Sequence, residues 1–94
     1  MKRTLILTSA LCTLAVAAQA ETKQVNVLGW GGSYGAAQVE AYLKPFEAKT
    51  GIKAVMADAD NPATPLKGQV EAGNVTTDVA SVEYADALRL CDEG

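Results

Sequence analysis

A short apolar run leads directly into a glycine-rich loop near the start of this chain. The run covers residues 25–28, with the sequence VNVL, and the loop covers residues 29–35, with the sequence GWGGSYG. An apolar pattern with helical spacing follows the loop. In α/β proteins, a loop between a strand and a helix lies at the carboxyl end of the strand, where ligands bind. The junction therefore predicts an α/β fold with a small-molecule site built around this loop.

The first 20 residues have the pattern of a secretory signal peptide. Lys2 and Arg3 precede an apolar stretch at residues 5–17, which is too short to span a bilayer as a helix. Residues 18–20, Ala-Gln-Ala, match the small-x-small pattern of a cleavage site. No stop-transfer pattern follows, so we expect cleavage after Ala20 and an exported protein that begins at Glu21, rather than an uncleaved membrane anchor.

The charge of residues 21–94 argues against nucleic-acid binding. Six of the chain's eight basic residues and all eleven acidic residues lie there, which gives this part a net charge of −5. No basic cluster follows Arg3, and Lys and Arg supply most of the affinity of proteins for nucleic acids. The chain has no histidine, and Cys91 is the single cysteine after residue 20, so we expect neither a metal site nor a cofactor.

Three strand–helix units follow one another in residues 21–94. The predicted strands cover residues 25–28, 52–56 and 78–82, and loops rich in Gly, Asp, Asn and Pro separate the elements. Strands that alternate with helices predict a parallel sheet with right-handed crossovers. A part of 74 residues supports only a marginal core, so we expect it to be the N-terminal part of a larger protein.

Capping and breaking residues predict where the first helix begins and ends. Ser33 is expected to cap the helix, Gly51 to end it, and Pro45 to kink or split it near residue 44. Its apolar positions have the spacing of one helical face, and they are Val39, Tyr42, Leu43 and Phe46.

Two further helices are predicted at residues 64–72, with Thr64 as the cap, and at residues 83–93. The apolar stripe of the last helix consists of Tyr84, Ala87, Leu88 and Cys91. Cys91 would suit a small core position. Export into an oxidising compartment instead favours a disulfide between Cys91 and a downstream cysteine.

The loops that follow the three strands carry aromatic and acidic side chains but no Lys or Arg. These candidate residues are Trp30, Ser33, Tyr34, Asp58, Asp60, Glu83 and Tyr84. Aromatic faces and carboxylates attract an ammonium group through cation–π contacts and charge-assisted hydrogen bonds. Structural roles are the alternatives: Asp58 and Asp60 would be solvated turn residues. Glu83 would favour the N-terminus of the last helix electrostatically, and Tyr84 would pack in the core.

The same glycine loop matches a second motif. Residues 31–35 fit G-x-S-x-G, the nucleophile elbow of α/β-hydrolases, which would make Ser33 a nucleophile. The triad also requires a histidine, and this chain has none. A fragment of a secreted hydrolase therefore stays an alternative, whereas the nucleotide-binding motifs lack their required Lys and Gly.

Three segments resemble one family of exported proteins. Residues 25–35, residues 44–53 (KPFEAKTGIK) and residues 77–84 (TDVASVEY) are similar to bacterial extracellular solute-binding proteins of ABC transporters. The nearest group is the spermidine/putrescine-binding type. The resemblance implies a periplasmic, non-enzymatic protein in which two α/β lobes close on a small solute and dock on a membrane permease. Residues 21–94 would form the start of lobe I, in a protein that is a monomer at full length.

The resemblance also implies a solute and a site. The solute would be a cationic polyamine such as spermidine or putrescine, held by residues that follow the first and third strands. The ligand-binding residues expected in this chain are Trp30, Ser33, Tyr34, Glu83 and Tyr84. Backbone N–H groups at residues 31–32 would alternatively suit a small anionic solute at the start of a helix.

Overall fold

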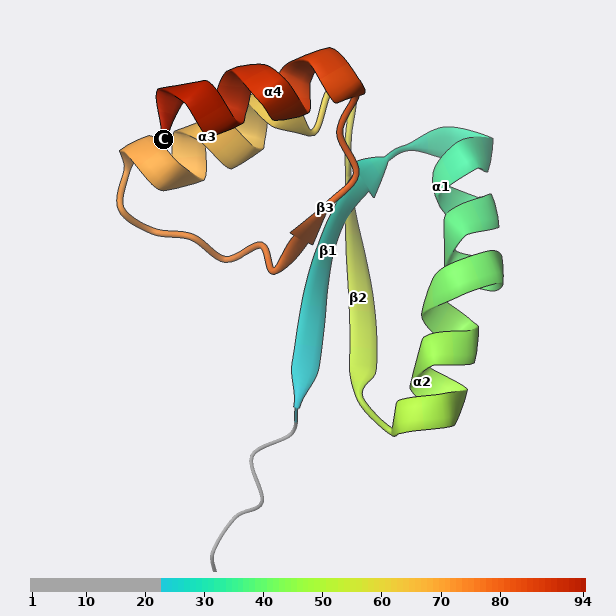
Figure 1. Cartoon of the computed structure of the whole chain (residues 1–94). Helices are drawn as coiled ribbons and strands as arrows, with labels where there is room; N and C mark the ends of the chain where they lie inside the picture. Colours follow the sequence, from blue (N-terminus) through green and yellow to red (C-terminus); the bar gives the residue numbers. More distant parts are fainter. Residues whose placement is uncertain (1–22) are drawn as a thin grey trace, which may run out of the picture.

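Three parallel strands form the centre of the structure. The computed structural model describes residues 23–94, and the expected signal peptide and its cleavage site lie outside them. The strands are β1 (Gln24–Trp30), β2 (Lys53–Ala59) and β3 (Val79–Ala80), in the order β2-β1-β3 (Figure 1). The register pairs Gln24 with Lys53 and Trp30 with Ala59, and it pairs Leu28 with Ala80. The predicted parallel α/β sheet is confirmed.

Helices cover the sheet on both sides. One nearly continuous helical segment consists of α1 (Gly32–Gln38), the π-helix η1 (Val39–Leu43) and α2 (Lys44–Thr50), and it packs against β1 and β2. The other pair, α3 (Ala63–Glu71) and α4 (Tyr84–Glu93), lies together on the opposite side of β1 in Figure 1. No helix within residues 23–94 is both long and apolar enough to cross a membrane.

Pro45 changes the winding of the first helical segment. Proline has no backbone N–H, and its ring would clash with the carbonyl group of Ala41 in a regular α-helix. The wider π-helical turns of η1 end immediately before Lys44, and Pro45 lies in the first turn of α2. The expected disturbance near residue 44 is therefore confirmed, as a change from π-helical to α-helical turns. Gly51 ends α2 with a φ of 70°, as expected for a left-handed terminal residue.

The first two strands extend further than their apolar runs. Trp30 belongs to β1, whereas the sequence placed it in the loop after residue 28. Asp58 belongs to β2 and pairs with Gly29, so its assignment to a loop was wrong. The cause is the parallel ladder, which supplies hydrogen bonds to the backbone of both strands whatever side chains they carry. The third strand is shorter than expected, because it pairs with β1 only at Val79 and Ala80.

Two expected helix caps were wrong. Ser33 lies inside the first turn of α1, where Gly31 is the N-cap and no side chain caps the helix within the described residues. Thr64 lies inside α3, and the backbone N–H of Ala63 instead donates to Oδ1 of Asn61 at 3.0 Å. Each helix begins one residue before the hydroxyl residue that was expected to cap it, α1 at Gly32 and α3 at Ala63.

The apolar stripes pack differently from the predicted faces. On α4, Tyr84 and Leu88 are 79% and 51% exposed, while the half-buried positions belong to Asp86, Ala87 and Leu90. The neighbour of α4 is α3, and the half-buried positions of α4 follow from this packing rather than from the predicted stripe. In the first helical segment Leu43 is buried but Tyr42 is 67% exposed, because π-helical turns rotate successive residues away from regular α-helical spacing.

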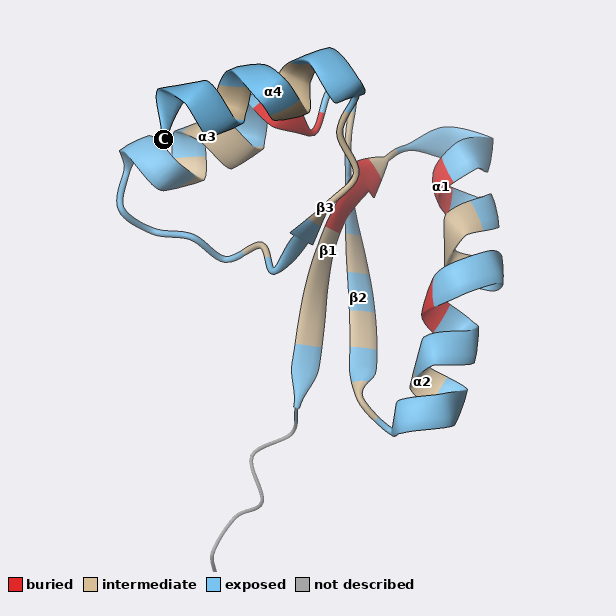
Figure 2. Ribbon diagram, in the orientation of Figure 1, coloured by how far each residue is buried: buried red, intermediate tan, exposed pale blue. Residues whose placement is uncertain are grey.

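The core of the described residues is small. Its buried apolar side chains are Leu28, Leu43, Pro62 and Ala63. Figure 2 shows the buried positions at the carboxyl end of β1, on the sheet-facing side of the first helical segment and at the start of α3. Most of the buried positions therefore lie near the carboxyl ends of the strands, where the glycine loop is located.

Candidate functional site

A cleft lies where the carboxyl ends of the three strands meet. Its volume is about 640 Å³, within the roughly 300–1,000 Å³ typical of small-molecule sites. The residues that line it are Trp30, Gly31, Gly32, Tyr34, Ala59, Asp60, Ser81, Val82 and Glu83. Each of the three strands therefore contributes its last residue or the loop that follows it. This is the position at which α/β sheets bind ligands.

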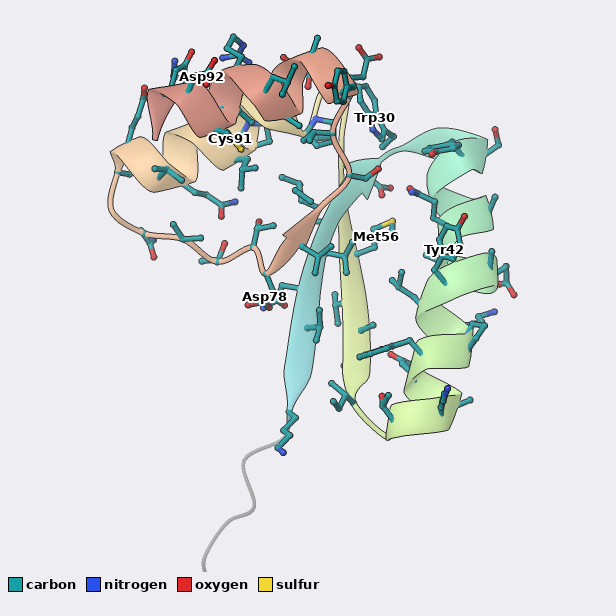
Figure 3. The ribbon with its side chains drawn as sticks, viewed as in Figure 1. Trp30, Tyr42, Met56, Asp78, Cys91 and Asp92 are labelled. Carbon is teal, nitrogen blue, oxygen red and sulfur yellow. The ribbon has the colours of Figure 1, made fainter. Side chains whose placement is uncertain are left out.

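Two aromatic side chains form one wall of the cleft. Trp30 is the last residue of β1 and is half-buried. Figure 3 shows it between the end of β1 and the start of α4. Tyr34 lies in the first turn of α1, where its side chain is 59% exposed. The fold therefore presents two aromatic side chains to the same space from adjacent elements.

Glycines on either side of Tyr34 allow α1 to approach β1 closely. A Cβ atom on Gly35 would lie 2.2 Å from the carbonyl oxygen of Trp30, so a side chain cannot fit there. Gly32 has a φ of 68°, which non-glycine residues rarely adopt. The carboxyl group of Asp58 lies under this loop, with Oδ1 at 3.3 Å from the same Cβ position on Gly35. The glycine-rich sequence is thus required by the local backbone geometry.

Two carboxylates line the cleft from the other two strands. Asp60 follows β2 and is exposed. Glu83 precedes α4 with an extended ψ of 153°, and its carboxylate makes no capping hydrogen bond to α4. Among the described residues that line the cleft there is no Lys or Arg. The Glu83 carboxylate lines the cleft and makes no hydrogen bond to the helix N-terminus. An electrostatic interaction with the start of α4 needs no such bond and stays the structural alternative for this residue.

The structure brings together four of the residues selected from the sequence. Trp30, Tyr34, Asp60 and Glu83 line the cleft, whereas Ser33, Tyr84 and Asp58 do not. Whether any of them binds a solute stays a prediction. Sequence reasoning missed Ala59, Ser81 and Val82. Only their positions could have indicated them, because Ala59 ends β2 and the other two residues lie between β3 and Glu83.

The site does not have the geometry of a hydrolase elbow. In that motif the nucleophile occupies a strained turn between strand and helix. No non-glycine residue within residues 23–94 has a positive φ, and Ser33 has its place in a regular helical turn. The described part also contains no cluster of three His, Cys, Asp or Glu side chains placed to hold a metal ion.

Comparisons with known proteins identify similar binding proteins. No family model matches the sequence. The chain is 41% identical over 80 residues to the gamma-aminobutyric acid-binding protein of Pseudomonas aeruginosa, a match that covers 85% of this chain. The chain spans only 23% of the length of that relative.

Two solved structures are similar to the described fold. An ABC transporter from Rhodopseudomonas palustris CGA009 matches with a TM-score of 0.66 and 30% identity, over 77% of this chain and 22% of the other. The open, unliganded PBP AttC of Agrobacterium tumefaciens strain C58 matches with a TM-score of 0.58 and 33% identity, over 62% of this chain and 18% of the other. The α/β fold expected from a two-lobed periplasmic binding protein is confirmed. The relative with 41% identity is named for γ-aminobutyric acid rather than for a polyamine, so the polyamine type stays a prediction.

Proposed function

We propose that this chain is part of a periplasmic solute-binding protein of an ABC importer, and that its cleft receives the ammonium end of a linear solute. The observation that carries the proposal is the cleft at the strand ends. Two aromatic side chains, Trp30 and Tyr34, and two carboxylates, Asp60 and Glu83, line it without a Lys or Arg among its described residues. The whole protein would be exported, would act without catalysis and would deliver the solute to a membrane permease.

The chemistry of the lining favours a cation. The face of an aromatic ring attracts an ammonium group, by about 0.5–1 kcal/mol at exposed sites and about 2 kcal/mol where water is excluded. Carboxylates add charge-assisted hydrogen bonds to the same group. Asp60 and Glu83 reach the cleft from different strands, so an ammonium group placed between them would be contacted from two sides.

Two solute classes share this ammonium end. A polyamine carries ammonium groups along a methylene chain, and γ-aminobutyric acid carries one ammonium group, a methylene chain and a carboxylate. The cleft described here fits the shared part of both. The opposite end of the solute would contact parts of the protein outside residues 23–94, and those contacts would distinguish an amino acid from a polyamine.

Calorimetry on the full-length protein tests the proposal. Titrations with γ-aminobutyric acid, putrescine and butyrate compare an amino acid, a diamine and a carboxylate without an ammonium group. We expect saturable binding of γ-aminobutyric acid or putrescine and none of butyrate. Butyrate that binds as tightly as γ-aminobutyric acid would assign the cleft to an anionic group at the glycine loop instead.

Trp30→Ala tests the aromatic wall in the same protein. We expect binding of the ammonium solute to weaken by about 1–2 kcal/mol, because a partly desolvated cation–π contact is lost. Tyr42→Ala is the matched control, since Tyr42 is an exposed aromatic residue outside the cleft lining. An unchanged affinity in Trp30→Ala, with the variant folded, would remove Trp30 from the site.

A further inference from the structure

We propose that Gln38, which lies outside the cleft lining, is a positioning residue for the wall formed by residues 81–83. This proposal rests on the proposed function of the cleft, and in it Gln38 acts on the solute only through Ser81. Gln38 is the last residue of α1, and its side chain reaches across β1 to Ser81, the residue that follows β3. Ser81, Val82 and Glu83 line the cleft together with residues of the glycine loop.

The wall is held to the sheet by few backbone contacts. The β3 strand pairs with β1 at only two positions, Val79 and Ala80. Beyond them, the backbone N–H of Ser81 donates to the carbonyl oxygen of Leu28 at 2.9 Å. The side-chain amide of Gln38 adds a second tether, in which Nε2 lies 3.5 Å from the Ser81 hydroxyl oxygen. One residue is therefore attached to β1 through its backbone and to α1 through its side chain.

Gly29 of β1 lies beside the Gln38 side chain. A Cβ atom on Gly29 would lie 2.9 Å from Sδ of Met56 and 3.4 Å from Oε1 of Gln38. Gly29 is buried near the carboxyl end of the pairing between β1 and β2, where a larger side chain would be ordinary. Met56 and Gln38 fill the face that the glycine leaves open, and Figure 3 shows Met56 on the side of the sheet that faces α1.

The stability of the fold does not by itself account for a glutamine here. The Oε1 atom of Gln38 is buried and has no hydrogen-bond partner among the described residues. An unpartnered buried acceptor lowers stability, and an apolar side chain of similar size would avoid that loss. The hydrogen bond of the Gln38 side chain goes to Ser81. We therefore infer that the glutamine serves to hold residues 81–83 in place.

Amide hydrogen exchange in the full-length protein tests the tether directly. In Gln38→Leu we expect faster exchange of the Ser81 amide, while the melting temperature is unchanged or higher. Gln69→Leu is the matched control, because Oε1 of Gln69 accepts from the N–H groups of Thr76 and Thr77 at 3.0 and 3.1 Å. That variant should instead speed exchange at Thr76 and Thr77 and lower the melting temperature. Exchange at Ser81 that is the same in Gln38→Leu and the wild type would overturn the proposal.

Measurements of solute affinity test whether the tether matters for binding. With γ-aminobutyric acid and putrescine as probes, Gln38→Leu should weaken binding by about fivefold, the fold-change of one neutral hydrogen bond, and Gln69→Leu should not weaken it. Ser81→Ala should weaken binding to a similar degree, and the double variant no further, because both changes remove the same tether. Fully additive losses would overturn the coupling. Wild-type protein that binds neither probe would contradict the proposed function, and the exchange of the Ser81 amide would still decide the role of Gln38.

Discussion

At the scale of single residues, the candidate site depends on glycines at positions where a side chain would not fit or would strain the backbone. Gly35 is buried against the carbonyl oxygen of Trp30, and Gly32 has a backbone conformation that favours glycine. The aromatic residues can therefore face one cleft only because the helix that carries Tyr34 starts in contact with the end of β1. Gly68 is different, since a Cβ atom there would meet no atom within 4 Å.

These two glycines make opposite predictions for the same substitution. Gly35→Ala should lower the free energy of unfolding by about 1–3 kcal/mol, because the new methyl group overlaps a backbone carbonyl that cannot move independently. Gly68→Ala should raise it by roughly 0.5–1 kcal/mol, because alanine favours the helix and fits open space. Denaturant unfolding of the full-length protein measures both. A stabilising Gly35→Ala would show that α1 does not approach β1 as closely as described.

At the scale of elements, α3 and α4 are joined by an exposed charged cluster. Nζ of Lys67 on α3 lies 2.8 Å from Oε2 of Glu93 on α4, and Nη1 of Arg89 lies 3.1 Å from Oε1 of the same glutamate. The hydrogen bond from Lys67 lowers the pKa of Glu93, and Arg89 lowers it further. The same contact with Glu93 raises the pKa of Lys67. The arrangement holds the end of α4 beside α3, where apolar burial is limited.

The pKa of Glu93 gives a pH-dependent prediction. It is lower in the folded chain than the ordinary value of 4.5, so the contribution of this group to stability is complete above the unfolded-state pKa. It is lost as the pH falls through the folded-state pKa. An NMR titration should find Glu93 below its ordinary range in the wild type and closer to it in Lys67→Met.

Lys44→Met is the control for this titration, because Lys44 pairs with Glu40 in the first helical segment. It should leave the pKa of Glu93 unchanged. The effect of Lys67→Met on overall stability should be small, since exposed ion pairs contribute little in water. A wild-type Glu93 that titrates at its ordinary value would show that the two helices are not joined by this contact.

At the scale of the whole molecule, much apolar surface lies open. Few apolar side chains of the described residues are buried, namely Leu28, Leu43, Pro62 and Ala63. Large apolar side chains such as Phe46, Val79 and Leu88 are at least partly exposed. An apolar groove of about 230 Å³ lies between the sheet and the first helical segment, lined in part by Tyr42, Phe46 and Val79. Exposed apolar patches of this kind promote association.

Residues 21–94 produced alone should therefore fold poorly or self-associate. We expect sedimentation to find assemblies larger than a monomer, and a broad thermal transition without cooperativity. Neither γ-aminobutyric acid nor putrescine should bind saturably, because this part forms only one side of the proposed site. A monomer with a cooperative melt and micromolar affinity would show that this part is a self-sufficient domain.

The sequence by itself determined the order and kind of the elements and the place of the cleft. Local signals were sufficient for this: apolar runs indicated strands, Gly51 ended a helix, and Pro45 disturbed one. Trp30, Tyr34 and Glu83 could be assigned to one edge of the sheet because the carboxyl ends of parallel strands lie together. These features depend on backbone preferences of neighbouring residues, which the sequence displays directly.

Only the tertiary structure decided how far the strands extend, which side of α4 packs, and which residues support the cleft. The pairing of Asp58 with Gly29 and the packing of α4 on α3 depend on partners that are distant in the sequence. Ser33 was expected as a cap, but the close approach of α1 to β1 placed it inside the helix. The contact between Gln38 and Ser81 has no local signal, because the two residues lie 43 positions apart in the sequence. Such contacts follow from packing between distant segments rather than from local conformational preference.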